Sequence, residues 1–281
     1  MKKKVILFVA LMVSVLLFSS CHKEGQYLPK KKIVRIERSS SEGVSEIEDW
    51  AWNGKLLSNI TIKTGGGDLI NESTFKYTSD KRVESIRVNF VDFVYNYVFT
   101  YDGKDLVKIS RQEEGSDDVD VYTFKKVDDH VVEITLAPVE SKSLDKFNVL
   151  RFILPTEVAD QIKPSEAKAT TTYRLTWEGD NVTQMDVLSN GVSAMKTTWK
   201  YDDKINPFNG LYSDASLRSK DMLYSANNII GESVALQIMG METVTNKDFE
   251  YTYDGKYPVE RTWISEALGQ QIKHTEKFYY K

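Results

Sequence analysis

The chain has 281 residues, of which 41% are hydrophobic and 28% charged, an ordinary composition for a globular protein. Its formal net charge is −4 and it has no basic stripe, which argues against nucleic-acid binding, because phosphate neutralisation supplies most of that affinity. Tyr (15), Phe (12) and Trp (5) are frequent and Pro (6) is rare, a mixture that favours β-strands.

The first twenty residues are typical of an export signal. Three lysines at residues 2–4 precede an apolar run over residues 5–18, which is short for a transmembrane helix and typical of a signal peptide. Ser19 and Ser20 then precede Cys21, the one cysteine of the chain. The stretch from Leu17 to Cys21 resembles the bacterial lipobox, in which cleavage falls before the cysteine and acyl chains such as palmitate are attached to it. The alternatives are an uncleaved anchor and a plain signal peptide followed by an incidental cysteine.

Removal of residues 1–20 takes away three of the 37 basic residues and no acid, so the mature chain carries 34 basic and 41 acidic residues, a balance of −7. Residues 21–32 are polar, and we expect them to form a lipidated tether, since several acyl chains hold a protein at a membrane stably. Lys23 followed by Glu24 resembles part of the surface-export signal of lipoproteins from gut Gram-negative anaerobes. We therefore expect an outer-membrane location, on either the periplasmic face or the cell surface.

A motif with a period near 24 residues recurs along the rest of the chain. It consists of an aromatic residue, a glycine two places later, and aliphatic residues five and eight places after the aromatic. Asn-Gly, Asp-Gly and Glu-Gly supply the positive φ of a tight turn, and the aliphatic residues suit the strand that follows. Each copy therefore predicts a β-hairpin. The close copies begin at Trp52, Tyr101 and Trp177, and the looser ones at Tyr77, Phe124, Tyr201 and Tyr253.

Consecutive hairpins of this kind make an antiparallel meander. The sequence predicts a single all-β domain over residues 33–281 with roughly 14 to 16 strands. We expect one strongly curved sheet or half-open barrel, because twist accumulates and open strand edges invite pairing. Two insertions are expected, at residues 138–170 and 204–245, with one or two short helices, and long insertions often carry function.

Two stretches allow the faces of single strands to be predicted. Tyr95, Tyr97, Phe99 and Tyr101 share one face of their strand. Within residues 82–90, alternation places Val83 with Arg87 on one face and Arg82 with Ile86 on the other. Charge at mid-strand on both faces argues against contact with lipid.

Segments spread along the chain resemble an uncharacterised lipoprotein family of gut Gram-negative anaerobes. They are the turn Tyr101-Asp102-Gly103-Lys104, the stretch KYDDKINPF over residues 200–208, and residues 224–229. The family is described as a domain of unknown function with a porin-like fold, and the resemblance spans most of residues 33–281. It implies a many-stranded antiparallel sheet on a lipid tether, with no assigned activity and no catalytic residues to carry over.

The charged residues suggest no metal or catalytic site. Asp128-Asp129-His130 and the acidic run over residues 113–120 both fall at expected turns, where Asp is favoured, and the run lacks the residue order of an EF-hand. His22 and His274 stand alone in the sequence. No nucleophile elbow or P-loop is present. We therefore predict no metal, no cofactor and no enzymatic activity. The alternative is a glycan-acting hydrolase, whose two carboxylates can come from any two strands.

The tryptophans are the candidate ligand-binding residues, because indole rings on a sheet can stack on sugars. The competing interpretation is cross-strand packing, the commoner role of aromatic residues in sheets. The five candidates are Trp50, Trp52, Trp177, Trp199 and Trp263.

The predicted function is non-enzymatic binding or assembly at the cell envelope, through the concave face of the sheet and the insertion at residues 204–245. The expected partners are the membrane, through lipid on Cys21, and a glycan or an envelope protein, but no nucleic acid. A further alternative is a structural subunit that pairs with an envelope protein along an exposed strand edge.

Overall fold

The computed structural model describes residues 25–41, 43–137, 171–211, 225–238, 241–267 and 270–281. Within these ranges all regular structure is β-strand, and no helix is long and apolar enough to cross a membrane. The strands are β1 (Ile33–Ser40), β2 (Gly43–Asn53), β3 (Leu56–Thr64), β4 (Leu69–Tyr77), β5 (Val83–Phe90), β6 (Val94–Asp102), β7 (Asp105–Glu113), β8 (Val119–Lys126), β9 (Val131–Ala137), β10 (Thr171–Glu178), β11 (Asn181–Ser189), β12 (Val192–Ile205), β13 (Asn227–Ile238), β14 (Met241–Asp248), β15 (Glu250–Asp254), β16 (Tyr257–Ala267) and β17 (Gln270–Tyr280).

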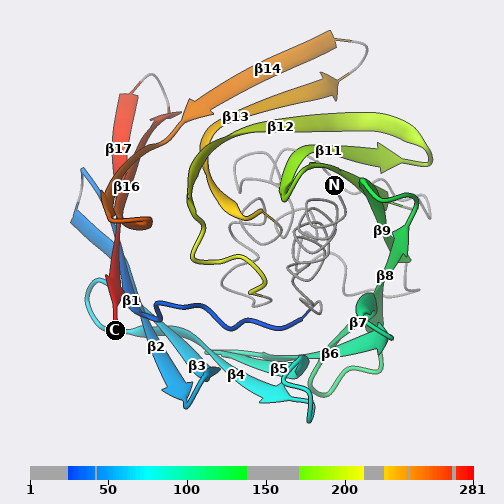
Figure 1. Ribbon diagram of the computed structural model, residues 1–281, viewed down its shortest axis with the longest axis horizontal. Coiled ribbons are helices and arrows are strands. Elements are labelled where there is room, and N and C mark those ends of the chain that lie inside the picture. The colour runs from blue at the N-terminus through cyan, green and yellow to red at the C-terminus, as the bar shows by residue number, and fades with distance from the viewer. Residues whose placement is uncertain (1–24, 42, 138–170, 212–224, 239–240, 268–269) are drawn as a thin grey trace, which may run out of the picture.

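The 17 strands form one antiparallel sheet that curves into a nearly closed barrel (Figure 1). Ladders join each strand to the next from β1 to β14, then β15 to β16 and β16 to β17, and a ladder between β17 and β1 closes the ring. The predicted all-β meander is confirmed, and the sheet curves far enough to close almost completely into a barrel. The helix expected within residues 138–170 falls outside the described residues.

The chain changes ladders at Phe249, which lies between β14 and β15. β14 pairs with β13, whereas β15 pairs with β16, and the Phe249 N–H donates to the Ile230 carbonyl at 3.0 Å. In the described residues no ladder joins β14 to the second half of β16, and the two strands diverge in Figure 1. We call the two facing edges, residues 241–247 and 263–267, the seam.

The predicted insertion at residues 204–245 was drawn too wide. Residues 227–238 and most of 241–245 belong to β13 and β14 and are ordinary members of the sheet. The period-two pattern of Val234 and Leu236, which are both buried, marks a strand. The repeat motif is weak there because Gly231 lies inside β13 and not in a turn. The hairpin of β13 and β14 therefore carries no clear copy of the motif.

The turns of the three close copies and of the copy at Tyr253 form as predicted, whereas the copy at Tyr201 makes no turn, because β12 continues to Ile205. Gly54, Gly103, Gly179 and Gly255 each follow an aromatic-ended strand, with φ between 56° and 63°, a conformation that L side chains rarely adopt. The aliphatic residue five places after the aromatic is buried in the three close copies, with Leu57, Leu106 and Val182 at most 3% exposed.

Each of the three close copies also carries a β-bulge that the sequence alone did not predict. At the first close copy Trp52 pairs with Leu57 and Ala51 with Asn59, so Ser58 is the extra residue. At five bulges of the sheet, the carbonyl of the residue before the extra one accepts a hydrogen bond from an aromatic side chain of the next hairpin. The donor and acceptor pairs are Trp52 to Ile33, Tyr77 to Leu57, Tyr101 to Val83, Tyr201 to Val182 and Tyr280 to Pro258.

A bulge also corrects the face predicted for Val83. Lys76 pairs with Ser85 and Tyr77 with Val83, so Glu84 is the extra residue of β5. The bulge shifts the alternation by one residue, which turns both Val83 and Ile86 into the barrel, 1% and 2% exposed. Arg87 remains on the outer face, where it is exposed.

The barrel interior holds two apolar clusters. One is built on β1 to β7 and β17 with residues of the N-terminal segment and the stretch after β12, and the other on β10 to β13. Tyr95, Tyr97 and Phe99 all face the first cluster, 5% to 8% exposed, as their predicted shared face requires. The inside of the walls is therefore lined mainly by aromatic and aliphatic residues, with a smaller number of buried polar residues among them.

The segment Gly25–Lys32 packs against the barrel and crosses one of its ends (Figure 1). Tyr27 is 1% exposed, contacts the rings of Trp50 and Trp52, and donates from its hydroxyl to the Pro207 carbonyl at 2.7 Å. Burial raises the pKa of Tyr27 well above its ordinary value, so the hydroxyl stays protonated. This part of the segment expected as a tether is thus held by the barrel, and residues 21–24 fall outside the described residues.

Candidate functional site

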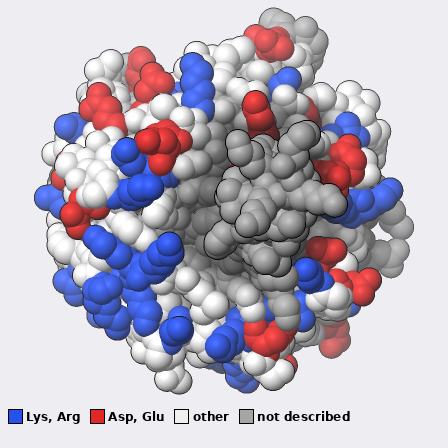
Figure 2. Space-filling view, in the orientation of Figure 1, with Lys and Arg blue, Asp and Glu red and all other residues white. Residues whose placement is uncertain are grey.

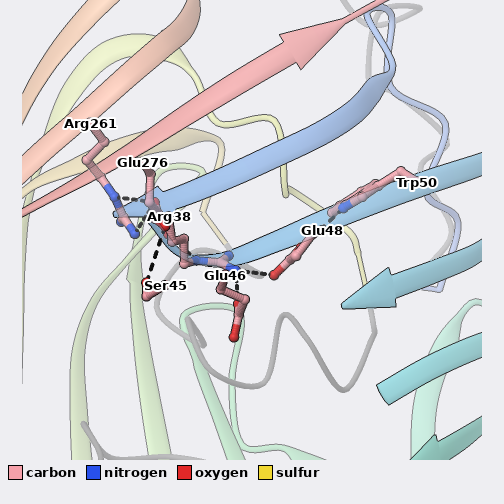
Figure 3. A network of polar contacts seen from close by, with 7 residues as sticks. All are labelled: Arg38, Ser45, Glu46, Glu48, Trp50, Arg261 and Glu276. Atoms are coloured by element: carbon pink, nitrogen blue, oxygen red, sulfur yellow. Dashed lines mark hydrogen bonds and ion pairs between the residues drawn. The ribbon is translucent and has the colours of Figure 1, made fainter. Parts of the chain in front are cut away.

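A row of four charged residues crosses the inner face of the barrel where its first and last strands meet (Figure 3). Glu46 on β2 is the cross-strand neighbour of Arg38 on β1, Arg38 is the neighbour of Glu276 on β17, and Glu276 is the neighbour of Arg261 on β16. The signs of the charges alternate along the row. Directly opposed pairs of opposite charge are the favourable arrangement in an antiparallel sheet.

Arg38 is the centre of this network. Its Nε donates to Glu276 at 2.7 Å, and its Nη1 contacts both Glu46 and Glu48. Glu48 also accepts a hydrogen bond from the Trp50 indole at 3.1 Å. Together these contacts tie β1 to β2 on one side and to β17 on the other.

Glu276 is held by two guanidinium groups. Arg261 donates to it from Nε at 2.8 Å and lies 2.6 Å away through Nη2, while Arg38 contacts its other oxygen. Burial by itself would raise the pKa of Glu276, but Arg261 and Arg38 outweigh it and hold that pKa below its ordinary value. The carboxylate is therefore ionised at neutral pH and is a poor proton donor.

The network fixes the strand register in which the barrel closes. A slip of β1 by one residue would turn Arg38 to the outer face, which leaves Glu48, 2% exposed, without its cation and Glu276, 3% exposed, with Arg261 alone. Breaking a buried ion pair by loss of one partner costs several kcal/mol, about 3 to 5, so the slipped register is strongly disfavoured. These ion pairs therefore have a structural role: they align β1 between β2 and β17.

An aromatic and polar group lies next to the network, one row along β16 and β17. The rings of Trp263 and His274 stack at 5.0 Å with an angle of 10°, and Ser265 Oγ lies 2.7 Å from His274 Nε2. The Arg261 guanidinium lies 5.0 Å from the Trp263 ring. This group adjoins the seam, because Trp263 and Ser265 belong to the unpaired edge of β16.

The five candidate tryptophans do not form one platform. Trp50 and Trp52 meet through Tyr27, and the indole N–H of Trp52 is used to cap the bulge at Ile33. Trp177 and Trp199 belong to the second apolar cluster. Trp263 lies apart from both pairs, beside His274, so a sugar-stacking role remains a prediction for each tryptophan singly.

The other sequence candidates have plain structural settings. Asp128 accepts a hydrogen bond from the His130 backbone at 2.7 Å, the local turn contact expected of an aspartate there. In the described residues no three His, Cys, Asp or Glu side chains come together as metal ligands. Cys21 lies outside the described residues.

The charged network was missed in the sequence. Its one visible signal is the alternation Glu46, Glu48, Trp50, Trp52, which places two acids on the same face as two aromatic residues. The cations that pair with those acids stand elsewhere, and Glu276 is 238 residues from Arg38. No local pattern joins residues so far apart.

The closure of the sheet defines the class of this structure, a nearly closed antiparallel β-barrel. A porin-like protein from Bacteroides vulgatus superposes with a TM-score of 0.52 at 8% identity, over 90% of this chain and 99% of that one. A porin-like protein from Bacteroides uniformis gives a TM-score of 0.50 at 12% identity, over 89% and 98%. At these identities the likeness is one of fold. No family model and no curated protein matches the sequence.

Proposed function

We propose that the protein is an exported lipoprotein of the outer membrane, anchored by lipid on Cys21, whose barrel stands in water and serves as a binding or assembly module. The observation that carries this proposal is the polarity of the outer wall. An export signal and a lipobox-like stretch precede Cys21 in the sequence, and they supply the anchor.

Charged residues lie on the outside of the barrel within several of its strands. Arg35, Asp49 and Lys63 form a row across β1, β2 and β3, with Arg35 at 2.7 Å and Lys63 at 3.8 Å from Asp49. Across the ring, Arg174 on β10 pairs with Glu133 on β9 at 2.7 Å. These pairs lie on opposite parts of the wall, so the polar surface is not limited to one side.

A lipid-embedded barrel needs an apolar outer band about 25 Å tall, and one Arg or Lys at the bilayer midplane costs roughly 2 to 4 kcal/mol. Arg35, Arg87, Arg174 and Lys196 all project outward from strand interiors. The porin-like architecture here therefore suits a barrel surrounded by water, with the membrane reached through the N-terminal lipid.

Substitution of Cys21 separates an anchored barrel from a spanning one. We expect wild-type cells fed radiolabelled fatty acid to yield a labelled protein in the membrane fraction. The Cys21→Ser variant should carry no label and should leave the membrane for the soluble fraction. A Cys21→Ser variant that folds and stays in the membrane after alkaline carbonate washing would contradict the proposal, as would an unlabelled wild-type protein.

Assembly with another envelope protein is favoured over sugar binding by the seam. Both of its edges offer backbone groups that no described strand pairs, and Val244 and Ile264 beside them are 51% and 55% exposed. Added strands bind such edges through main-chain hydrogen bonds. Amide exchange tests this role: within residues 241–247, the amides that point away from β13 should exchange fast in the purified protein and slowly in outer-membrane vesicles, and equal exchange in both would exclude assembly at the seam.

A further inference from the structure

The two ends of the barrel carry opposite charge. Successive turns of an antiparallel meander fall alternately at its two ends. We call the end that holds Gly25–Lys32, Lys281 and the repeat turns the lysine rim. The described residues between strands there include nine basic and four acidic residues, a balance of +5. They are Lys30, Lys31, Lys32, Lys55, Lys81, Arg82, Lys104, Lys256 and Lys281 against Asp80, Asp128, Asp129 and Asp180.

The opposite end, the acidic rim, has the reverse balance. Its described residues between strands include five acids and no Lys or Arg, a balance of −5. The acids are Asp68, Asp92, Glu114, Asp117 and Asp118. The two ends of the barrel therefore differ in the sign of their charge, although the formal net charge of the chain is small.

The lysines gather in one sector of their rim. The backbones of Lys32 and Lys281 are joined by two hydrogen bonds, of 2.9 and 3.3 Å, and Lys32 Nζ contacts the carbonyl of Gly54 beside Lys55. Lys31 pairs with Asp254 at 2.8 Å, next to the turn that holds Lys256. Figure 2 shows this gathering of blue side chains at the lower left, where the C-terminus lies in Figure 1.

The point at which the chain leaves the barrel towards Cys21 lies at this same rim. The Gly25 carbonyl accepts a hydrogen bond from the Val83 backbone at 2.9 Å. A Cβ on Gly25 would come within 2.1 Å of the Tyr101 hydroxyl, so the chain is closely packed there. Three residues lie between Gly25 and Cys21, and the four steps from one Cα to the other span at most about 14 Å. A lipid on Cys21 therefore emerges at the lysine rim.

We propose that the lysine rim rests on the phosphate-bearing headgroups of the membrane and that the acidic rim points away from it. This inference depends on the lipid anchor of the proposed function. The short reach from Gly25, at most about 14 Å, keeps the rim near the headgroups, at a distance comparable with the Debye length of roughly 10 Å at 0.1 M salt. Lysines at an anionic surface each strengthen binding about fivefold, so the rim adds both orientation and affinity.

Fluorescence quenching measures the orientation directly. The lipidated protein is labelled at Ser79→Cys on the lysine rim or at Asp92→Cys on the acidic rim, both exposed positions, and bound to phosphatidylcholine vesicles with or without phosphatidylglycerol. With a headgroup quencher in anionic vesicles, we expect strong quenching at position 79 and little at position 92. Equal quenching at the two positions, or stronger quenching at position 92, would overturn the inference.

Matched charge reversals test the role of the lysines. The rim variant is K30E/K55E/K256E, and the control K196E/K200E/K273E makes the same charge change on the wall. All six lysines are exposed. The measurement uses the mature chain with Cys21→Ser, so that acyl chains make no contribution to binding. In that chain the rim variant should bind anionic vesicles about a hundredfold more weakly. The control should keep most of its binding, because its lysines lie away from the rim. Equal losses would refute the inference.

The lipid anchor and the orientation fail separately in these experiments. If the wild-type protein carries no fatty acid and does not float with neutral vesicles, the anchor is wrong. If it floats with neutral vesicles but shows no difference between positions 79 and 92 on anionic ones, the anchor stands and the orientation is wrong.

Discussion

Replacement of Arg38 by methionine tests the closure network most sharply. The side chain keeps its length but loses the charge that meets Glu46, Glu48 and Glu276. Leaving a buried charge without its partner costs about 3 to 5 kcal/mol. Because the Arg38 side chain is 22% exposed and water reaches part of it, we expect a loss near the lower end, about 3 kcal/mol of unfolding free energy.

The same strand offers a matched control. Arg35 lies on β1 as well, but it faces outward, is 46% exposed, and pairs with Asp49. Exposed ion pairs contribute about 0 to 1 kcal/mol, so Arg35→Met should cost no more than that. Urea unfolding followed by tryptophan fluorescence gives both values. Equal costs for Arg38→Met and Arg35→Met would refute the idea that the inner row aligns the closing strands.

The pH dependence of the two proteins gives an independent check. In the wild type the pKa of Glu276 is lowered, so its contribution is complete above its unfolded pKa of about 4.3 and is lost as pH falls through the folded value. In Arg38→Met this carboxylate has lost one of its two cations and gains less from being ionised. The stability difference between wild type and variant should therefore shrink on acidification below about pH 4, and a constant difference would contradict this account.

Three further substitutions test the repeat and the interior. Tyr77→Phe removes the cap on the Leu57 bulge and should cost about 1 kcal/mol, whereas Tyr279→Phe, at a 40% exposed residue, should be nearly neutral; equal urea midpoints would argue against the cap. Ser73→Ala should raise the unfolding free energy by about 1 kcal/mol, because this buried hydroxyl has no hydrogen-bond partner among the described residues, and a loss would show that it has one. Gly25→Ala should lower the melting temperature, since residue 25 has φ of 79° and no room for a Cβ; an unchanged value would mean that the segment is loosely held.

The sequence predicts this fold well because its signals are local. A turn glycine such as Gly54, a strand-ending aromatic such as Trp52 and a buried aliphatic such as Leu57 lie within six residues of one another, and each hairpin forms from its own short segment. Repetition then orders the hairpins into a meander. The bulges are harder to predict from the sequence, because the extra residue has no sequence signature. One extra residue also moves the side chains before it to the opposite face of the strand, as at Val83.

The closure of the sheet and its network are not local. β1 and β17 pair although Ile33 and Tyr280 stand at opposite ends of the domain, and Arg38 finds Glu276 through that pairing alone. The N-terminal segment is a similar case. Its polar composition predicts a tether, and one aromatic residue, Tyr27, buried by packing against Trp50 and Trp52, ties it to the barrel.

The central claim is that the barrel of this protein is surrounded by water while lipid on Cys21 holds it at the membrane. Single cysteines at Thr74 and Lys196, exposed outward positions in β4 and β12, and at the buried Met195 allow a direct measurement, because the native cysteine is blocked by lipid under this claim. In the membrane-bound protein, a membrane-impermeant maleimide should label positions 74 and 196 as fast as in detergent, and position 195 slowly in both. Protection of positions 74 and 196 in the membrane alone would contradict the claim.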